Sequence, residues 1–191
     1  MRHRPRDAAP RSSRVLAALT IAALVASLTP RATHATTVVP VTVETLATRA
    51  DAVVIATPRW SRSQWLGRTI VTDYELEVSV SVRGTVSAGT TIVLRLAGGS
   101  VGRIGQMIPG VIAPAVGTPY LFFLSRAAGI ANTYYTTHLT AAVLPLSTAT
   151  TPTVLVRPAT EGMVLQDRGE TVMSSQGVTL ARLVEVLRAV R

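Results

Sequence analysis

The stretch TDYELEVSVSV, residues 72–82, decides the fold class of this chain. Large apolar residues alternate in it with acidic residues and serines. Because successive side chains of a β-strand point to opposite faces, this alternation predicts a half-buried strand that ends at Arg83-Gly84. Its inward residues would be Tyr74, Leu76, Val78, Val80 and Val82, and its water-facing acidic residues would be Asp73, Glu75 and Glu77.

Other short apolar runs, separated by glycine or proline, predict further strands on both sides. Residues 51–57 fit a buried strand that continues past Pro58 as a more polar ribbon, up to a turn at Leu66-Gly67-Arg68. Later strands are expected at 90–96, with Ile92, Leu94 and Leu96 inward, at 120–124, at 133–140, and in a short pair at 143–146 and 154–156.

One long connection and two helices complete the pattern. Residues 97–119 contain six glycines and three prolines. No regular element is expected there, and a loop of this length in a compact domain is typically functional or mobile. A short helix is predicted from Val43 to Ala50, with Thr42 as its N-cap. A second helix would follow a Thr179 cap, and its apolar face would hold Leu180, Leu183, Val184, Leu187 and Val190.

These elements predict a mainly β fold. Five strands, with a long connection between the third and the fourth and with flanking helices, favour an OB-like five-stranded antiparallel barrel with a short N-terminal helix and a C-terminal helix. A β-sandwich of seven strands is the alternative.

Residues 1–35 have the three parts of a secretory signal peptide. Arginines crowd the first 14 residues, an apolar run follows from Val15 to Leu28, and the small residues Thr33 and Ala35 flank His34. The apolar run is shorter than the roughly 20 residues of a membrane-spanning helix. We therefore expect a signal peptide over 1–35, an extracellular or periplasmic location, and no membrane span in the mature chain. A single β-rich domain would cover 36–191, with its core at about 36–146 and a C-terminal β/helix extension over 147–191.

The composition excludes several classes of function. Cysteine is absent, which rules out disulfides, thiol nucleophiles and thiolate metal sites. Six of the 19 arginines and one of the ten acidic residues lie before Thr36, so the mature chain would carry a net charge of +4 in place of +9. Such a modest charge does not favour nucleic acid as a partner.

Three segments follow one another as they do in a known family. Residues 50–56 read ADAVVIA, residues 74–78 read YELEV ahead of Val82-Arg83-Gly84, and Tyr120-Leu121 opens a later strand. Through these segments the stretch from about Thr36 to Leu146 resembles the netrin-like (NTR) domain, the OB-fold module shared with the tissue inhibitors of metalloproteinases. The stretch from Ala97 to Leu124 is similar to a glycine-rich part of a set of uncharacterised secreted bacterial proteins.

This resemblance implies a function and a set of binding residues. In the metalloproteinase inhibitors, the free amino group and the first carbonyl of the mature chain chelate the zinc of the protease. The resemblance places Thr36, Thr37 and Val38 over that opening, which here lacks both of its cysteines. It implies a secreted, non-catalytic protein-binding module without a cofactor. Its partner would be another exported or surface protein, with a metalloprotease as one candidate.

The polar ribbon adds further candidate binding residues. Trp60, Arg62 and Trp65 belong to it, and tryptophan and arginine are enriched at the energetic hot spots of protein interfaces. Packing of the two indole rings against a neighbouring strand is the alternative interpretation.

Two other classes of function stay open at this point. A structural envelope or matrix protein would need no dedicated ligand. A hydrolase would need a base, and His138 is the one histidine after residue 35. No serine elbow motif accompanies His138, and one histidine falls short of a zinc site. The sequence thus predicts neither catalytic nor metal-binding residues.

The first testable prediction concerns the leader. Cleavage after Ala35 is expected, because the small-residue pattern follows the apolar run at the distance typical of signal peptides. N-terminal sequencing of the exported protein should read Thr-Thr-Val. An exported chain that still begins at Met1 would contradict this prediction.

Overall fold

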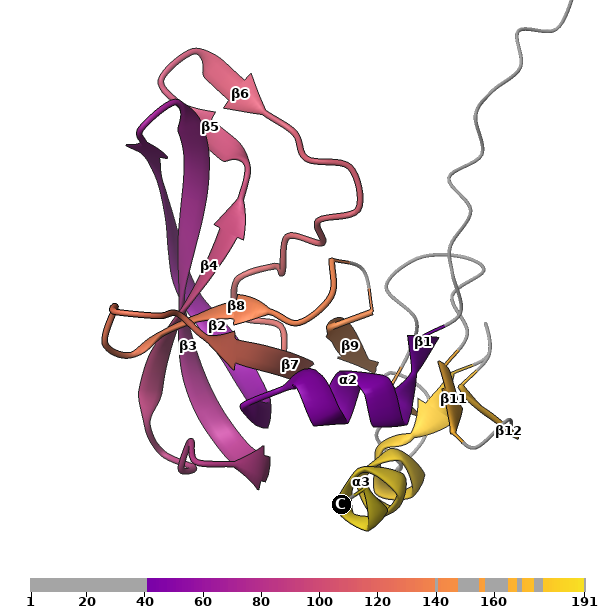
Figure 1. Cartoon of the computed structure of the whole chain (residues 1–191). Helices are drawn as coiled ribbons and strands as arrows, with labels where there is room; N and C mark the ends of the chain where they lie inside the picture. The colour runs from indigo at the N-terminus through magenta and orange to yellow at the C-terminus, as the bar shows by residue number, and fades with distance from the viewer. Residues whose placement is uncertain are drawn as a thin grey trace, which may run out of the picture. The chain divides into compact units, whose positions relative to one another are not determined.

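The computed structural model describes residues 41–139, 141–147, 155–156, 165–167, 170–173 and 177–190. These residues are mainly β, with helices α2 and α3 packed beside the strands (Figure 1). The expected signal peptide and residues 36–40 lie outside the described residues.

The elements follow one another in this order: β1 (Val41–Thr42), α2 (Val43–Arg49), β2 (Ala52–Leu66), β3 (Thr69–Gly84), β4 (Thr91–Ala97), β5 (Gly99–Val101), β6 (Ile104–Gln106), β7 (Tyr120–Arg126), β8 (Thr133–Thr136), β9 (Val143–Ser147), β10 (Leu155–Val156), β11 (Leu165–Asp167), β12 (Glu170–Met173), β13 (Val178–Thr179) and α3 (Leu180–Ala189).

Most of these strands belong to one mixed sheet, in the order β13-β10-β9-β7-β2-β3-β4-β8. Within it β4 and β8 run parallel, and the other pairs are antiparallel. β8 also pairs with β7. Five strands therefore form a closed circuit of pairings, in which each strand pairs with two of the others: β2, β3, β4, β8 and β7. Two smaller sheets consist of β1-β11-β12 and of β5-β6.

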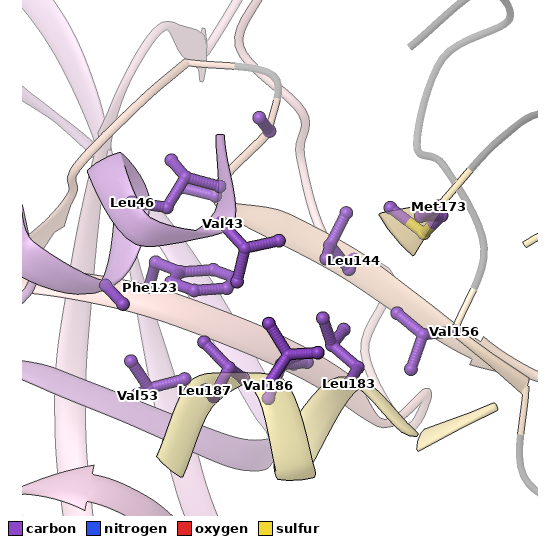
Figure 2. Close-up of a cluster of buried hydrophobic side chains, with 14 of the residues drawn as sticks. Val43, Leu46, Val53, Phe123, Leu144, Val156, Met173, Leu183, Val186 and Leu187 are labelled. Carbon is purple, nitrogen blue, oxygen red and sulfur yellow. The ribbon is translucent and has the colours of Figure 1, made fainter. Parts of the chain in front are cut away.

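The first part of β2, Ala52–Ala56, and Tyr120–Leu124 of β7 are buried on both faces, which explains why these segments are apolar without alternation. On one face Val53, Ile55, Leu121 and Phe123 pack against helices α2 and α3 (Figure 2). On the other face Val54 and Phe122, with neighbours on the same strands, pack against the inward side chains of β3, β4 and β8. The sheet therefore separates two apolar clusters, one under the helices and one enclosed by the strands.

Both predicted helices are confirmed, with their caps. The side chain of Thr42 accepts a hydrogen bond from the backbone N–H of Thr45, and Thr179 does the same for Arg182. Each cap satisfies a backbone donor that the first turn of a helix leaves without a partner. In α3 the predicted apolar face was wrong in one respect, because Val186 is buried together with Leu183 and Leu187 in place of Val184.

The strands predicted at 51–66, 90–96, 120–124 and 143–146 are confirmed, and Ile92, Leu94 and Leu96 point inward as expected. The strand predicted over 133–140 is shorter, because β8 ends at Thr136. The small sheet formed by β1, β11 and β12 had no counterpart in the sequence prediction.

The alternation predicted along β3 is confirmed for Tyr74, Leu76 and Val78 but is wrong for Val80, which is 42% exposed. It is also wrong for Val82, which is partly buried but packs against the cluster under the helices. The pairing of β2 with β3 explains the difference. Ile55 lies opposite Val80, but its neighbour Ala56 lies opposite Val78, so Ser79 is an extra residue in β3. A bulge of this kind shifts the residues beyond it to the other face of the sheet.

The prediction that residues 97–119 contain no regular element was also wrong. A short hairpin, β5–β6, occupies the first part of this stretch. Its tight turn contains Gly102, which has a φ of +59°. Glycine-rich segments are atypical of strands, so the sequence pattern alone did not indicate this hairpin.

The bulge in β3 generates a prediction about stability. Leu76→Ala should cost about 2 to 5 kcal/mol, because it leaves a cavity in the enclosed cluster. Val80→Ala should change stability by no more than about 0.5 kcal/mol, because that side chain is exposed. Urea unfolding of the two variants measures both values. Equal losses would mean that Val80 points into the core and that the bulge is absent.

Candidate functional site

The β2–β3 ribbon extends well beyond the strands that flank it. β7 pairs with β2 only over Ala52 to Ala56. Further along β2, the backbone N–H of Gly117 donates to the carbonyl oxygen of Pro58. From Trp60 to Leu66, β2 pairs with β3 alone, and its other edge has no strand partner among the described residues.

The candidate residues of this ribbon do not share one face. Trp60 and Trp65 are 45% and 47% exposed. The register has no irregularity between them, so residues five positions apart point to opposite faces. Trp65 lies opposite the buried Ile70, whereas Trp60 and Arg62 lie opposite Glu75 and Asp73. Trp60 and Arg62 are therefore brought together, and Trp65 is not. Thr36, Thr37 and Val38 lie outside the described residues.

Hydrogen bonds hold the β5–β6 hairpin against the ribbon, on the face that carries Ile70 and Trp65. The backbone N–H of Gly98 donates to the carbonyl oxygen of Ile70 (2.8 Å), and the N–H of Ile70 donates to Oε1 of Gln106 (2.6 Å). The hydroxyl of Thr72 donates to the carbonyl oxygen of Gly98 (2.7 Å) and lies 2.9 Å from that of Ser63. Buried polar groups are thus paired where the hairpin covers the ribbon.

Gly99 allows this close approach. Its φ is +128°, and a Cβ atom at this position would lie 2.1 Å from Oγ1 of Thr72 and 2.5 Å from Oγ of Ser63. Neither contact is possible for a real side chain, so the hairpin needs glycine there.

Exposed apolar side chains gather at the end of the ribbon and on the adjoining hairpin. We call Trp65, Ile104 and Met107 the hairpin patch; Leu66, next to Trp65 in the regular register of β2, points to the other face of the ribbon. Each residue of the patch is at least 47% exposed, and Met107 reaches 91%. In Figure 1 the end of the β2–β3 ribbon lies beside β5 and β6, in agreement with the hydrogen bonds above. Large apolar side chains clustered on a surface mark interaction sites more often than isolated ones do.

A pocket of about 130 Å³ lies beside the hairpin patch. Its walls are formed by Thr72, Tyr74, Leu96, Ala97, Gly98, Gly99, Gln106, Met107, Ile108, Val111 and Ala113. None of these side chains carries a formal charge. Tyr74 is only 8% exposed, and burial, with the nearby Tyr120 as a smaller cause, raises the pKa of its hydroxyl. That hydroxyl stays protonated in neutral solution.

The acidic side chains of β3 do not form one solvated face. Glu77 is exposed as predicted and forms an ion pair with Arg59. Asp73, in contrast, accepts two hydrogen bonds from Arg95 (2.6 and 2.8 Å) and one from Gln64 (2.8 Å). Its side chain is largely buried, and the hydrogen bond with Asp73 is the main cause that raises the pKa of Arg95. This bidentate pair links β3 to β4 where Asp73 and Arg95 lie opposite each other.

His138 lines a second pocket, of about 270 Å³, together with Arg49 and the hydroxyls of Thr42, Thr45 and Thr137. Its Nδ1 accepts a hydrogen bond from the backbone N–H of Ala141 (3.3 Å). In a serine-type triad the Nδ1–H of the histidine donates to a carboxylate. In this pocket Nδ1 of His138 is the acceptor of a hydrogen bond, in place of the donor that it is in such a triad.

Within the described ranges, no three histidine, cysteine, aspartate or glutamate side chains gather in a way that would hold a metal ion. No helix in the same ranges has the length and hydropathy needed to cross a membrane. The chain matches no protein-family model, no curated protein and no solved structure.

The close approach at Gly99 leads to a prediction with a matched control. Gly99→Ala should destabilise the protein by at least about 1 kcal/mol more than Gly102→Ala, because displacing the hairpin breaks hydrogen bonds worth about 0.5 to 1.5 kcal/mol each. Gly102 also has a positive φ, but nothing lies within 4 Å of a Cβ atom there. Urea unfolding gives the two free energies. Equal losses of unfolding free energy in the two variants would show that backbone strain alone determines the cost at both positions.

Proposed function

We propose that this chain is a secreted, non-catalytic protein-binding module with an OB-type, NTR-like barrel. The observation that carries the proposal is the hairpin patch beside an edge of β2 that has no strand partner in the described part of the chain. The patch supplies apolar area, and the edge supplies backbone donors and acceptors.

The pairing pattern supports the barrel. The circuit β2-β3-β4-β8-β7 leads back to β2 through the β7–β2 pairing. Such a circuit is what a small closed or partly open barrel requires. The β-sandwich alternative needs two separate sheets, and the direct hydrogen bonding of β7 to β8 and to β2 speaks against that separation.

The chemistry of the patch supports recognition of a protein. Trp65 is of a residue type that dominates hot spots, and Met107 is flexible enough to adapt its shape to a partner. The free edge of β2 can accept an extended segment as an additional strand. Trp60 and Arg62, on the other face of the same ribbon, can contact the outward side chains of that segment.

The partner class follows from the predicted export and from the resemblance. Another exported or surface protein would meet this module, and a metalloprotease is the candidate that the NTR-like segments suggest. Chelation of a protease zinc by Thr36 uses backbone atoms and needs no cysteine. Without a disulfide to fix the terminus, ordering it on binding costs about 1 to 2 kcal/mol for each residue fixed.

Two alternatives remain candidates. In a structural envelope or matrix component, the exposed apolar residues would pack between copies of this chain. Such a protein would bind no defined partner. A hydrolase would use the pocket at His138, and the hydrogen bond that Nδ1 accepts there is unfavourable to it.

Loss of the hairpin patch should abolish recognition. Trp65→Ala and Ile104→Ala are each expected to weaken partner binding by about 2 kcal/mol or more if they are hot spots. The mature domain, immobilised, is exposed to culture supernatant, and the retained protein is identified and titrated. Ile130→Ala is the matched control, because Ile130 is also exposed but lies outside the patch. Equal retention by all variants, or retention of no defined protein, would contradict the proposal.

The mature terminus gives a separate prediction for the metalloprotease case. An extra alanine before Thr36 would move the amino group by up to about 3.5 Å, too far for it to reach the zinc ion. Inhibition of a co-secreted metalloprotease should therefore be lost with the extended terminus and present with the native one. Inhibition by both forms would reject chelation, and inhibition by neither would reject a protease as the partner.

A further inference from the structure

The pocket under Met107 has a polar group that the fold itself does not use. The hydroxyl of Tyr74 makes no hydrogen bond to any described residue, although this side chain is only 8% exposed. Burying a hydroxyl without a partner is unfavourable. Tyr120, its neighbour, has a partner, because the backbone N–H of Ala115 donates to its hydroxyl oxygen (3.0 Å).

A second unused donor lies on the same wall. Oε1 of Gln106 accepts the N–H of Ile70, and this hydrogen bond fixes the orientation of the amide. The Nε2 group is then left without a partner in the described part of the chain. Tyr74 and Gln106 line the same pocket, together with the apolar side chains of Leu96, Ile108 and Val111.

The size of the pocket limits its occupant. Sites for drug-sized ligands and cofactors occupy about 300 to 1,000 Å³, more than twice the 130 Å³ found here. A cavity of about 150 Å³ is known to hold a benzene ring. The pocket is slightly smaller but opens to the surface beside the exposed Met107 and Ala113, so a single six-membered ring is the largest group that it suits. Because no charged side chain lines the pocket, a neutral occupant matches it and an ion does not.

We propose that this pocket, which we call the Tyr74 pocket, receives the side chain of a tyrosine from the protein partner. The phenol ring fills the apolar walls, and its hydroxyl pairs with Tyr74 and Gln106. Phenylalanine would fill the same volume but would leave both polar groups without partners. The inference rests on the proposed binding function, because Met107 belongs both to the hairpin patch and to the wall of the pocket.

The first test uses p-cresol and toluene, which are small-molecule analogues of the tyrosine and phenylalanine side chains. Each is added to the whole mature protein as a probe of the Tyr74 pocket. Titrations followed by amide NMR shifts at Gly98 and Gln106 should show that p-cresol binds more tightly. Tyr74→Phe removes only the hydroxyl, so it should weaken p-cresol binding about 2- to 12-fold, as expected for one neutral hydrogen bond, and leave toluene binding unchanged. Absence of p-cresol binding, or equal effects of the substitution on both probes, would overturn the proposal.

The second test asks whether the pocket is used by the partner. Ala113→Phe should fill the pocket, because Ala113 lines it and is exposed, and it should weaken both p-cresol binding and partner retention. Ala88→Phe, at an exposed alanine outside the pocket, is the control. If Ala113→Phe blocks p-cresol but leaves partner retention unchanged, the Tyr74 pocket is not the anchor site. The effects of the hairpin-patch variants would still stand in that case, so the two proposals can fail separately.

Discussion

The pairing of β2 with β7 is the constraint on which the rest of the structure depends. Where they pair, over Ala52–Ala56 and Tyr120–Leu124, both strands are buried on both faces, so their backbone groups lie where water cannot reach them and must find partners on neighbouring strands. One face then requires helices α2 and α3 as a cover, and the other requires β3, β4 and β8. Because the chain contains no cysteine, these two apolar clusters must stabilise the fold without disulfides.

The burial of these two clusters explains which features of the fold can be predicted from the sequence. Periodicity reports burial, so Leu76 and Leu94 were placed correctly from the alternation of their neighbours alone. Capping depends on a single side chain close in sequence, so Thr42 and Thr179 were also predictable. The bulge at Ser79 was not, because an extra residue in one strand is defined only by the register of its partner.

The candidate site was predictable only in part, for a similar reason. The sequence indicated the ribbon and its exposed Trp60, Arg62 and Trp65, yet strand alternation alone already puts residues 60 and 65 on opposite faces. The Tyr74 pocket depends on contacts between residues far apart in the chain, such as Ile70 with Gln106 and Thr72 with Gly98. The pair Gly98-Gly99 was the one available signal, because two adjacent glycines after a strand favour a close approach of backbones.

The two apolar clusters also determine where binding can occur without loss of the fold. Burial of β2 ends near Pro58, and from there to Leu66 the strand is held by β3 and by the hydrogen bonds to the β5–β6 hairpin. Side chains in this part of β2 contribute little to the core, so Trp60 and Trp65 can remain exposed without loss of core packing. The separation of core and ribbon thus lets a cysteine-free domain combine a well-packed sheet with large exposed side chains at the end of the ribbon, where we propose that a partner binds.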